Sequence, residues 1–186
     1  MHAAAVASGG RAVLLPAPAG SGKSTLAAGC ALAGWDMLAD DTVVLEGAPD
    51  DARLRPLPLA ACLKPGSWRP LTALGADLDA LPVHERLDGR RARYLSPARA
   101  AREPLALAAI VAVHWQAAGA SPARLRPLAP LQAFEALMPQ FYPLGGPFDA
   151  AAVGYAAALV ARTPCFALEY GVLTEGIALL ARACAP

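Results

Sequence analysis

The pattern of apolar and polar positions predicts that the chain begins with two short strands joined by a tight turn. Apolar residues dominate "AAAVAS" and "RAVLLP" on either side of Gly9-Gly10. Glycine accepts the positive φ angles that such a hairpin turn needs. The second strand leads directly into a glycine-rich loop at 17–23. Strong helix formers then run from Ser24 to Ala33, and Gly34 is a natural residue to end that helix.

Beyond this helix, apolar runs and helical segments alternate, which is typical of an α/β fold. "DMLADDTVVLE" predicts a strand, an acidic corner and another strand, and Leu105–His114 fits a central buried strand. Helices are predicted over Pro130–Met138, from an N-cap at Asp149 to Arg162, and from Thr174 onward. Shorter strands are expected at "RLRPLPLAACL", which suits an edge or an irregular path, and at "RARYL", "ARLRPL" and "PCFALEY".

The segment from Lys64 to Pro104 has weak periodicity and is rich in proline, glycine and charged residues, which predicts short strands and loops. No repeat or linker divides the chain. We therefore expect a single domain over residues 1–186, with a mixed, twisted sheet flanked by helices. The loop helix should cover one face of the sheet, and the C-terminal helices should pack nearby.

Composition narrows the functional classes. The 186 residues suit one domain with a substantial core, and 56% are hydrophobic while 17% are charged. The longest strongly apolar run, Leu105–Trp115, is too short to cross a bilayer, and we see no secretory signal. A net charge of +1 favours neither nucleic acid nor an anionic membrane as a partner. We therefore expect a cytoplasmic protein that binds neither.

Several polar and aromatic residues allow two interpretations. The arginines between Arg86 and Arg102 form either a solvated face or a site for phosphates or an acidic peptide. Lys64 either reaches a phosphate or extends its stem along an apolar surface. Arg162 either complements a helix end or clamps a nucleotide. We expect His84 at the surface and His114 in the core, and packing roles for Trp35, Trp68 and Trp115.

The four cysteines lie far apart, at positions 30, 62, 165 and 184. Their spacing with histidines suggests no zinc site. Cys30 falls on an apolar helix, where a buried, reduced thiol is expected.

The strongest chemical signal is "APAGSGKST", which follows a predicted strand and opens a predicted helix. In that context the backbone N–H groups of a glycine-rich loop surround phosphate oxygens, and the helix directs its positive end at them. Lys23 would reach the β- and γ-phosphates, and the Ser24 hydroxyl would ligate magnesium. Ala17 replaces the first glycine of the usual motif, where compactness matters most. The alternative is a chance turn before a helix. The residues predicted to bind the nucleotide are Ala19, Gly20, Ser21, Gly22, Lys23, Ser24 and Thr25.

A pair of aspartates, Asp40 and Asp41, lies one helix beyond this loop, at the end of a predicted strand. Carboxylates at such a position hold the metal or the attacking group in phosphoryl-transfer enzymes. Successive residues of an extended chain point to opposite sides, so one aspartate can face the nucleotide while the other supports the corner. The alternative is an ordinary acidic turn between strands.

This arrangement resembles the catalytic core of bacterial HPr kinase/phosphorylase. In that family a strand with a histidine precedes G-x-S-G-x-G-K-S, and a helix, a "G-H/W-x-L-x-A-D-D" turn and a strand follow. Here the pieces read "MHAAAVASGGRAVLLPAPAGSGKSTLAAGCALAGWDMLADDTVVL". The separations of the loop lysine from the aspartate and from the histidine match without a gap. Later segments, among them "RYLSP", "AIVAVHW" and "RTPCFALEYG", are similar to the related kinase A group, which is in turn related to lasso peptide kinases.

The resemblance implies a P-loop kinase fold, ATP and Mg²⁺ as cofactors, and roles for individual residues. Asp41 would be the general base toward a substrate hydroxyl, Asp40 would support it or hold the metal with Ser24, and His2 would lie near the reacting phosphoryl group. His2 could instead belong to a frayed terminus. In place of the family's E-x-R-G signature, which supplies a magnesium ligand, the chain has "PLPLAACLKPGSW". The N-terminal domain of the family's enzymes is also expected to be absent.

Three functions follow from these features. The first is a kinase that phosphorylates a serine hydroxyl of a peptide or small protein. The second is a nucleotide-binding regulatory or chaperone module of a peptide-modification system, with weakened catalysis. The third is a bifunctional enzyme that also runs the reaction in reverse. The resemblance further implies a possible homo-oligomer.

Overall fold

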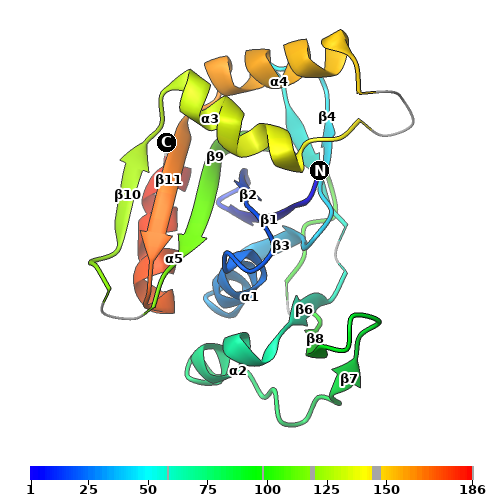
Figure 1. Cartoon of the computed structure of the whole chain (residues 1–186), viewed down its shortest axis with the longest axis vertical. Coiled ribbons are helices and arrows are strands. Elements are labelled where there is room, and N and C mark those ends of the chain that lie inside the picture. Colours follow the sequence, from blue (N-terminus) through cyan, green and yellow to red (C-terminus); the bar gives the residue numbers. More distant parts are fainter. Residues whose placement is uncertain (58, 98, 118–119, 144–147, 186) are drawn as a thin grey trace.

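A mixed eight-stranded sheet forms the centre of the protein (Figure 1). The structure is a computed structural model that describes residues 1–57, 59–97, 99–117, 120–143 and 148–185. Six strands lie side by side in the order β10-β11-β9-β2-β1-β3, and β5 joins the sheet through β9 and also pairs with β4. The strands are β1 (Ala3–Ser8), β2 (Arg11–Pro16), β3 (Asp36–Ala39), β4 (Val44–Glu46), β5 (Arg53–Arg55), β9 (Leu105–Trp115), β10 (Arg124–Pro127) and β11 (Cys165–Tyr170).

The strand directions place the carboxyl ends of four strands along one edge of the sheet. Strands β2, β9 and β11 run parallel, while β1 is antiparallel to both β2 and β3. The carboxyl ends of β2, β3, β9 and β11 therefore share an edge with the start of β1. Ala3 pairs with Pro16, so the chain start lies beside the point where β2 enters the glycine-rich loop. Ligands of α/β folds bind beyond the carboxyl ends of parallel strands.

Helices cover both faces of the sheet, and the alternation along β2 shows which face each helix covers (Figure 1). Val13 and Leu15 are buried in a cluster with α1 (Lys23–Leu32) and α5 (Leu173–Cys184). Leu14, which points to the opposite face, is buried with α3 (Pro130–Leu137) and α4 (Ala150–Arg162). A short 3₁₀ helix, Met138–Gln140, follows α3. The predicted α/β class, with a mixed sheet flanked by helices, is confirmed.

A small three-stranded sheet extends from one end of the molecule, at the bottom of Figure 1. It contains β6 (Ala61–Leu63), β8 (Arg91–Leu95) and β7 (His84–Glu85), and helix α2 (Pro65–Thr72) packs beside it. The weak periodicity of this segment predicted only strands and loops, so α2 was not expected. Two prolines within eight residues suggest a break, but Pro65 occupies the first turn, where a missing N–H costs nothing.

Most local predictions agree with the structure. The Gly9-Gly10 hairpin forms, Gly34 follows α1 with a φ of 92°, and Asp149 caps α4 by accepting from the N–H of Ala152 at 3.0 Å. Cys30 and Trp35 are buried. In the extended segment "RLRPLPLAACL", Pro58 lies outside the described residues. That residues 1–186 form a single domain stays a prediction.

The prediction for His114 was wrong. His84 is exposed as expected, but His114 is exposed as well. The pairing of β2 with β9 ends at Leu14 and Ile110, so β9 continues past its neighbour before it reaches His114. A strand end without that neighbour is covered on fewer sides, and its polar side chain can stay in water.

No helix within the described residues has both the length and the apolar character that a membrane crossing requires.

Candidate active site

The glycine-rich loop after β2 leads into the N-terminus of α1. Gly20 and Gly22 have positive φ angles of 88° and 92°, and Gly22 is the N-cap of α1. These conformations strongly favour glycine. The Ser21 hydroxyl donates to the carbonyl of Pro18 at 2.6 Å, which closes the turn. The loop therefore wraps the N-terminus of α1, where backbone N–H groups and the helix dipole attract an anion.

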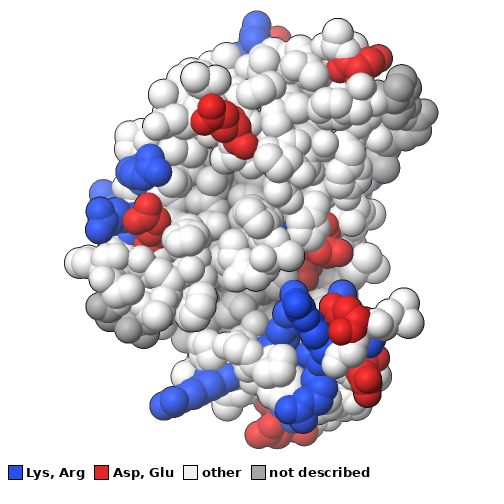
Figure 2. All heavy atoms as spheres, viewed as in Figure 1, with Lys and Arg blue, Asp and Glu red and all other residues white. Residues whose placement is uncertain are grey.

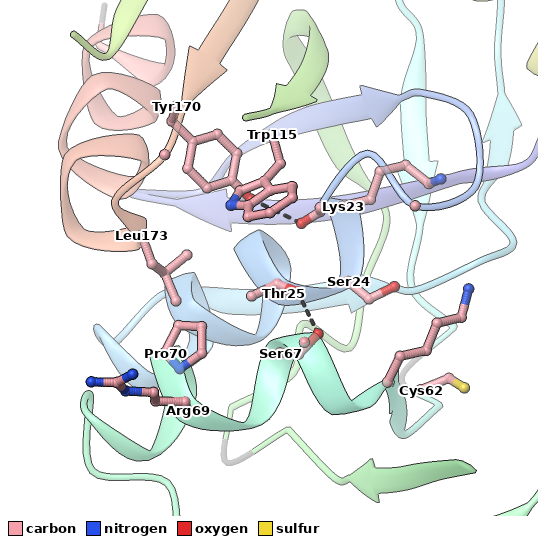
Figure 3. Close-up of a pocket in the computed structure, with 15 residues that line it drawn as sticks. Lys23, Ser24, Thr25, Cys62, Ser67, Arg69, Pro70, Trp115, Tyr170 and Leu173 are labelled. Carbon is pink, nitrogen blue, oxygen red and sulfur yellow. Dashed lines mark hydrogen bonds between the residues drawn. The ribbon is translucent and has the colours of Figure 1, made fainter. Parts of the chain in front are cut away.

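Two neighbouring strands hold the loop in place. The backbone N–H of Trp115, at the end of β9, donates to the carbonyl of Ser21 at 3.0 Å. The hydroxyl of Tyr170, at the end of β11, donates to the carbonyl of Gly22 at 3.1 Å (Figure 3). A Cβ atom on Gly22 would lie 2.5 Å from that hydroxyl oxygen and 2.9 Å from the Trp115 Cβ. Close approach, as well as the φ angle, therefore requires glycine here.

Lys23 is the central cation of the site, although only 6% of the residue's surface is exposed. Its Nζ donates to the carbonyls of Ala17 at 2.6 Å and Pro18 at 3.1 Å. Burial lowers the pKa of Lys23, while the nearby carboxylates of Asp40 and Asp41 act in the opposite direction. The ammonium thus rests on neutral carbonyl oxygens beside the loop, a position from which it can turn to a phosphate.

The two aspartates point to different environments, as expected, but not through alternation along an extended chain, because β3 ends at Ala39 and the chain bends at both residues. Asp40 is 4% exposed, and its Oδ2 accepts from the backbone N–H of Cys62 at 3.2 Å. The other oxygen, Oδ1, is buried without a hydrogen-bond partner among the described residues. Burial raises the pKa of Asp40, and the Ser24 hydroxyl and the Cys62 N–H partly offset that rise. A buried carboxylate oxygen without a donor is suited to a cation.

Asp41 instead faces solvent, with a φ angle of 68° and a side chain that is 75% exposed. Aspartate is among the few residues besides glycine that adopt this left-handed conformation readily. The turn that it makes directs its carboxylate toward the start of β1. Oδ1 of Asp41 lies 3.2 Å from Nδ1 of His2.

His2 joins the exposed aspartate to the loop lysine. Its Nε2 lies 3.3 Å from Nζ of Lys23, and its Nδ1 lies 3.2 Å from both the carbonyl oxygen and Oδ1 of Asp41. Its backbone N–H donates to the carbonyl of Gln140 at 2.8 Å. The alternative of a frayed terminus is therefore wrong, because His2 is anchored where β1 begins.

Ser24 and Asp40 supply the oxygen atoms that a magnesium ion prefers. Mg²⁺ is commonly held by one or two protein oxygens together with phosphate oxygens and water. Oδ1 of Asp40 is free to serve as a ligand, and Ser24 lies close enough to affect the pKa of that carboxyl. Across the described residues, no group of three or more His, Cys, Asp and Glu side chains could hold a metal. The Asp40 carboxylate and the Ser24 hydroxyl fit the one or two protein ligands that a magnesium ion usually takes.

A cavity of about 550 Å³ opens beside the loop (Figure 3). Lys23 and Ser24 lie toward one end, and Trp115, Leu173 and Pro70 lie toward the other. The volume lies within the range of small-molecule sites. Lys64 also lines the cavity, which favours its interpretation as a phosphate contact. Wall residues that sequence reasoning did not assign to the site are Cys62, Gly66, Ser67, Arg69, Pro70, Trp115, Tyr170, Gly171 and Leu173.

The remaining charged candidates serve structural contacts. Arg162 donates to the carbonyl of Ala158 in the last turn of α4 at 3.4 Å, which agrees with a role at the helix end. In the basic cluster, Arg93 pairs with Asp79 at 2.6 Å and stacks over Trp68 at 4.6 Å, which gives that tryptophan a packing role. Figure 2 shows acidic side chains among the basic ones at the end formed by β6, β7, β8 and α2. The cluster therefore resembles a solvated face.

No protein-family model matches the chain, and no curated protein matches it. Among solved structures, the chain is similar to the Hpr(Ser) kinase/phosphatase from Coxiella burnetii. That comparison has a TM-score of 0.41 and 12% sequence identity, and it covers 98% of this chain and 95% of the other. Because both values are low, we base the function on the geometry of the site.

Proposed function

We propose that the protein is an ATP-dependent, magnesium-requiring kinase that phosphorylates a serine hydroxyl of a peptide or small protein. The observation that carries this proposal is the contact series from Asp41 through His2 to Lys23. It joins an exposed carboxylate to a buried cation at the end of a phosphate-binding loop. A kinase needs these elements: a base at the acceptor, a cation at the transferred group, and a fixed position for both.

Each residue has a defined role in this proposal. The backbone of Gly20–Lys23 and the N-terminus of α1 hold the β- and γ-phosphates, and Lys23 turns from the carbonyls of Ala17 and Pro18 to the γ-phosphate. Asp40 and Ser24 would hold magnesium, which neutralises charge that develops on the phosphate oxygens. His2 orients the carboxylate of Asp41 and adds a hydrogen bond near the reacting group.

Asp41 accepts the proton of the acceptor hydroxyl as that oxygen bonds to the γ-phosphorus. The bond between the γ-phosphorus and the β–γ bridging oxygen breaks, and ADP leaves with that oxygen. The wide exposure of the Asp41 side chain supports a macromolecular acceptor, because a hydroxyl on a protruding segment can reach it from solvent.

One observation favours a second candidate, a nucleotide-binding regulatory or chaperone module with weakened catalysis. Among the described residues, no third carboxylate joins Asp40 and Asp41 in a group that could hold a metal. Such a module would bind ATP through the same loop without transferring phosphate.

The deciding experiment incubates the protein with γ-labelled ATP, Mg²⁺ and an array of serine-containing peptides. A kinase transfers label to peptides and loses this activity in Asp41→Asn. If ATP binds but no label is transferred or released, and Asp41→Asn changes nothing, the kinase proposal fails and the regulatory candidate stands. Label that returns from phosphopeptide to ADP or to water identifies a bifunctional enzyme.

A further inference from the structure

Trp115 is fixed to the phosphate loop through its backbone, while its side chain remains half exposed. Its N–H donates to Ser21, its Cβ lies against Gly22, and 50% of its surface is accessible. From the sequence, a packing role was expected for Trp115. An indole that borders a cavity and remains half exposed is instead free to contact a ligand.

The cavity has two ends of different chemistry. At one end, Lys23, Ser24 and the loop backbone form the phosphate site. At the other, Trp115 and Leu173 lie on one side and Pro70 on another, with Arg69 beside it (Figure 3). A nucleotide whose phosphates occupy the loop extends its base away from it, and the apolar end lies within the same cavity.

We propose that this apolar end, formed by Trp115, Leu173 and Pro70, is the subsite for the base of the nucleoside triphosphate, with the Trp115 indole as its stacking surface. This inference rests on nucleotide binding at the loop, as proposed above. Leu173 and Pro70 supply apolar contacts to the base. Because every base has a π-face, stacking tolerates different bases. The binding of ATP and the binding of GTP should therefore depend on Trp115 to the same extent.

The test compares the binding of ATP, GTP and inorganic tripolyphosphate to the full chain by calorimetry. Base–aromatic stacking predicts that Trp115→Ala weakens ATP and GTP binding by about 5- to 150-fold. Tripolyphosphate has no base, so its affinity stays within about twofold of wild type. Trp115→Phe keeps a π-face and retains most of the nucleotide affinity. The matched control is Phe148→Ala, an aromatic residue with 53% exposure that is not among the residues lining the cavity.

The possible results separate the subsite from the proposed function. If Trp115→Ala weakens the binding of tripolyphosphate as much as the binding of ATP, Trp115 only supports the loop and the subsite is refuted. If Trp115→Ala binds ATP and tripolyphosphate as tightly as wild type does, the base lies elsewhere. If wild type binds none of the three ligands, nucleotide binding itself fails and the subsite falls with it. In wild type, ATP should also quench tryptophan emission more than tripolyphosphate does, and Trp115→Phe should lose that difference.

Discussion

Nδ1 of His2 lies 3.2 Å from Oδ1 of Asp41, although 39 residues separate them in sequence. The contact arises because β1 is antiparallel to β3, so the start of one strand meets the turn after the other. It fixes an exposed carboxylate that would otherwise rotate freely. A carboxylate held in one orientation beside the loop lysine is suited to accept a proton from an approaching hydroxyl.

Asp41→Asn should strongly slow phosphoryl transfer while leaving ATP binding intact. Loss of a general base lowers kcat by roughly 10²- to 10⁴-fold. Asparagine adopts the left-handed conformation about as readily as aspartate, so the backbone at the 68° φ angle is kept. The assay measures kcat with a peptide acceptor and the Kd for ATP.

The matched control for this variant is Asp51→Asn. The Asp51 side chain is 73% exposed and pairs with Arg53 at 3.5 Å, in a setting much like that of Asp41 but outside the site. Its kcat should equal that of wild type. Equal loss in both variants would show that general surface charge, rather than a base at position 41, affects the rate.

A double-mutant cycle should reveal coupling between His2 and Asp41. His2→Gln removes the ring that orients the carboxylate, and we expect a decrease in kcat of roughly tenfold. If His2 acts through Asp41, the double variant His2→Gln/Asp41→Asn loses little beyond Asp41→Asn alone, a coupling that approaches the whole tenfold effect, about 1.4 kcal/mol. Effects on kcat that simply add would contradict a role for His2 in positioning Asp41.

The half of the candidate site that contains the loop and the aspartates could be predicted from sequence because it is nearly contiguous. The loop, α1, β3 and the aspartates occupy one unbroken stretch, in which a hairpin and one helix determine the distance from His2 to Lys23 and to Asp41. Hydrophobic periodicity and turn residues are local signals, and they are sufficient for such a stretch.

The other half could not be predicted because distant segments form it. Trp115 and Tyr170 reach the loop only because β9 and β11 pair beside β2, and no local pattern encodes that pairing. Pro70 arrives on α2, a helix that its two prolines conceal. The error at His114 has the same origin, since its exposure depends on where a distant strand ends.

Asp40→Asn should stabilise the fold at neutral pH while impairing magnesium-dependent activity. Burial is the largest influence on this carboxyl and raises its pKa above the ordinary 3.8, whereas attraction to Lys23 is the smallest. A raised pKa means that folding is favoured when the carboxyl is protonated, and that contribution is lost as the pH rises through the raised pKa. At pH 7.5 the neutral amide should therefore raise the unfolding temperature, by roughly 2–4 °C for a gain of about 1 kcal/mol.

The pH dependence distinguishes this mechanism from a general packing effect. As the pH falls toward 3.8, Asp40 of the wild-type protein becomes protonated. The unfolding temperature of wild type should then approach that of Asp40→Asn. Asp51→Asn, at an exposed position, serves as the control and should show no such convergence. A stability difference between Asp40→Asn and wild type that stays constant from pH 7.5 to pH 4 would contradict the assignment to a buried charge.

Lys64→Met should weaken ATP binding by roughly tenfold, as expected for loss of one charge-assisted contact. Lys64 lines the cavity together with Lys23 and also lowers the pKa of that residue, so the two cations are close. Arg162→Met is the comparison, because Arg162 bonds to its own helix and is not among the cavity residues. Equal ATP affinity in Lys64→Met and wild type would mean that Lys64 does not contact a phosphate and only extends its stem along an apolar surface.

Gly22→Ala should unfold at a lower temperature than Gly34→Ala, although both glycines have a φ of 92°. The left-handed strain of about 1–2 kcal/mol is common to both variants. Only at position 22 does the new Cβ overlap other atoms, at 2.5 Å from the Tyr170 hydroxyl, whereas nothing lies within 4 Å at position 34. That overlap adds about 1–3 kcal/mol, so Gly22→Ala should melt roughly 2–12 °C below Gly34→Ala.

Nucleotide binding should be lost only in Gly22→Ala, because Tyr170 and Trp115 can no longer close on the loop. Equal unfolding temperatures in calorimetry would mean that the ends of β9 and β11 move aside at little cost, and that they do not fix the geometry of the phosphate site.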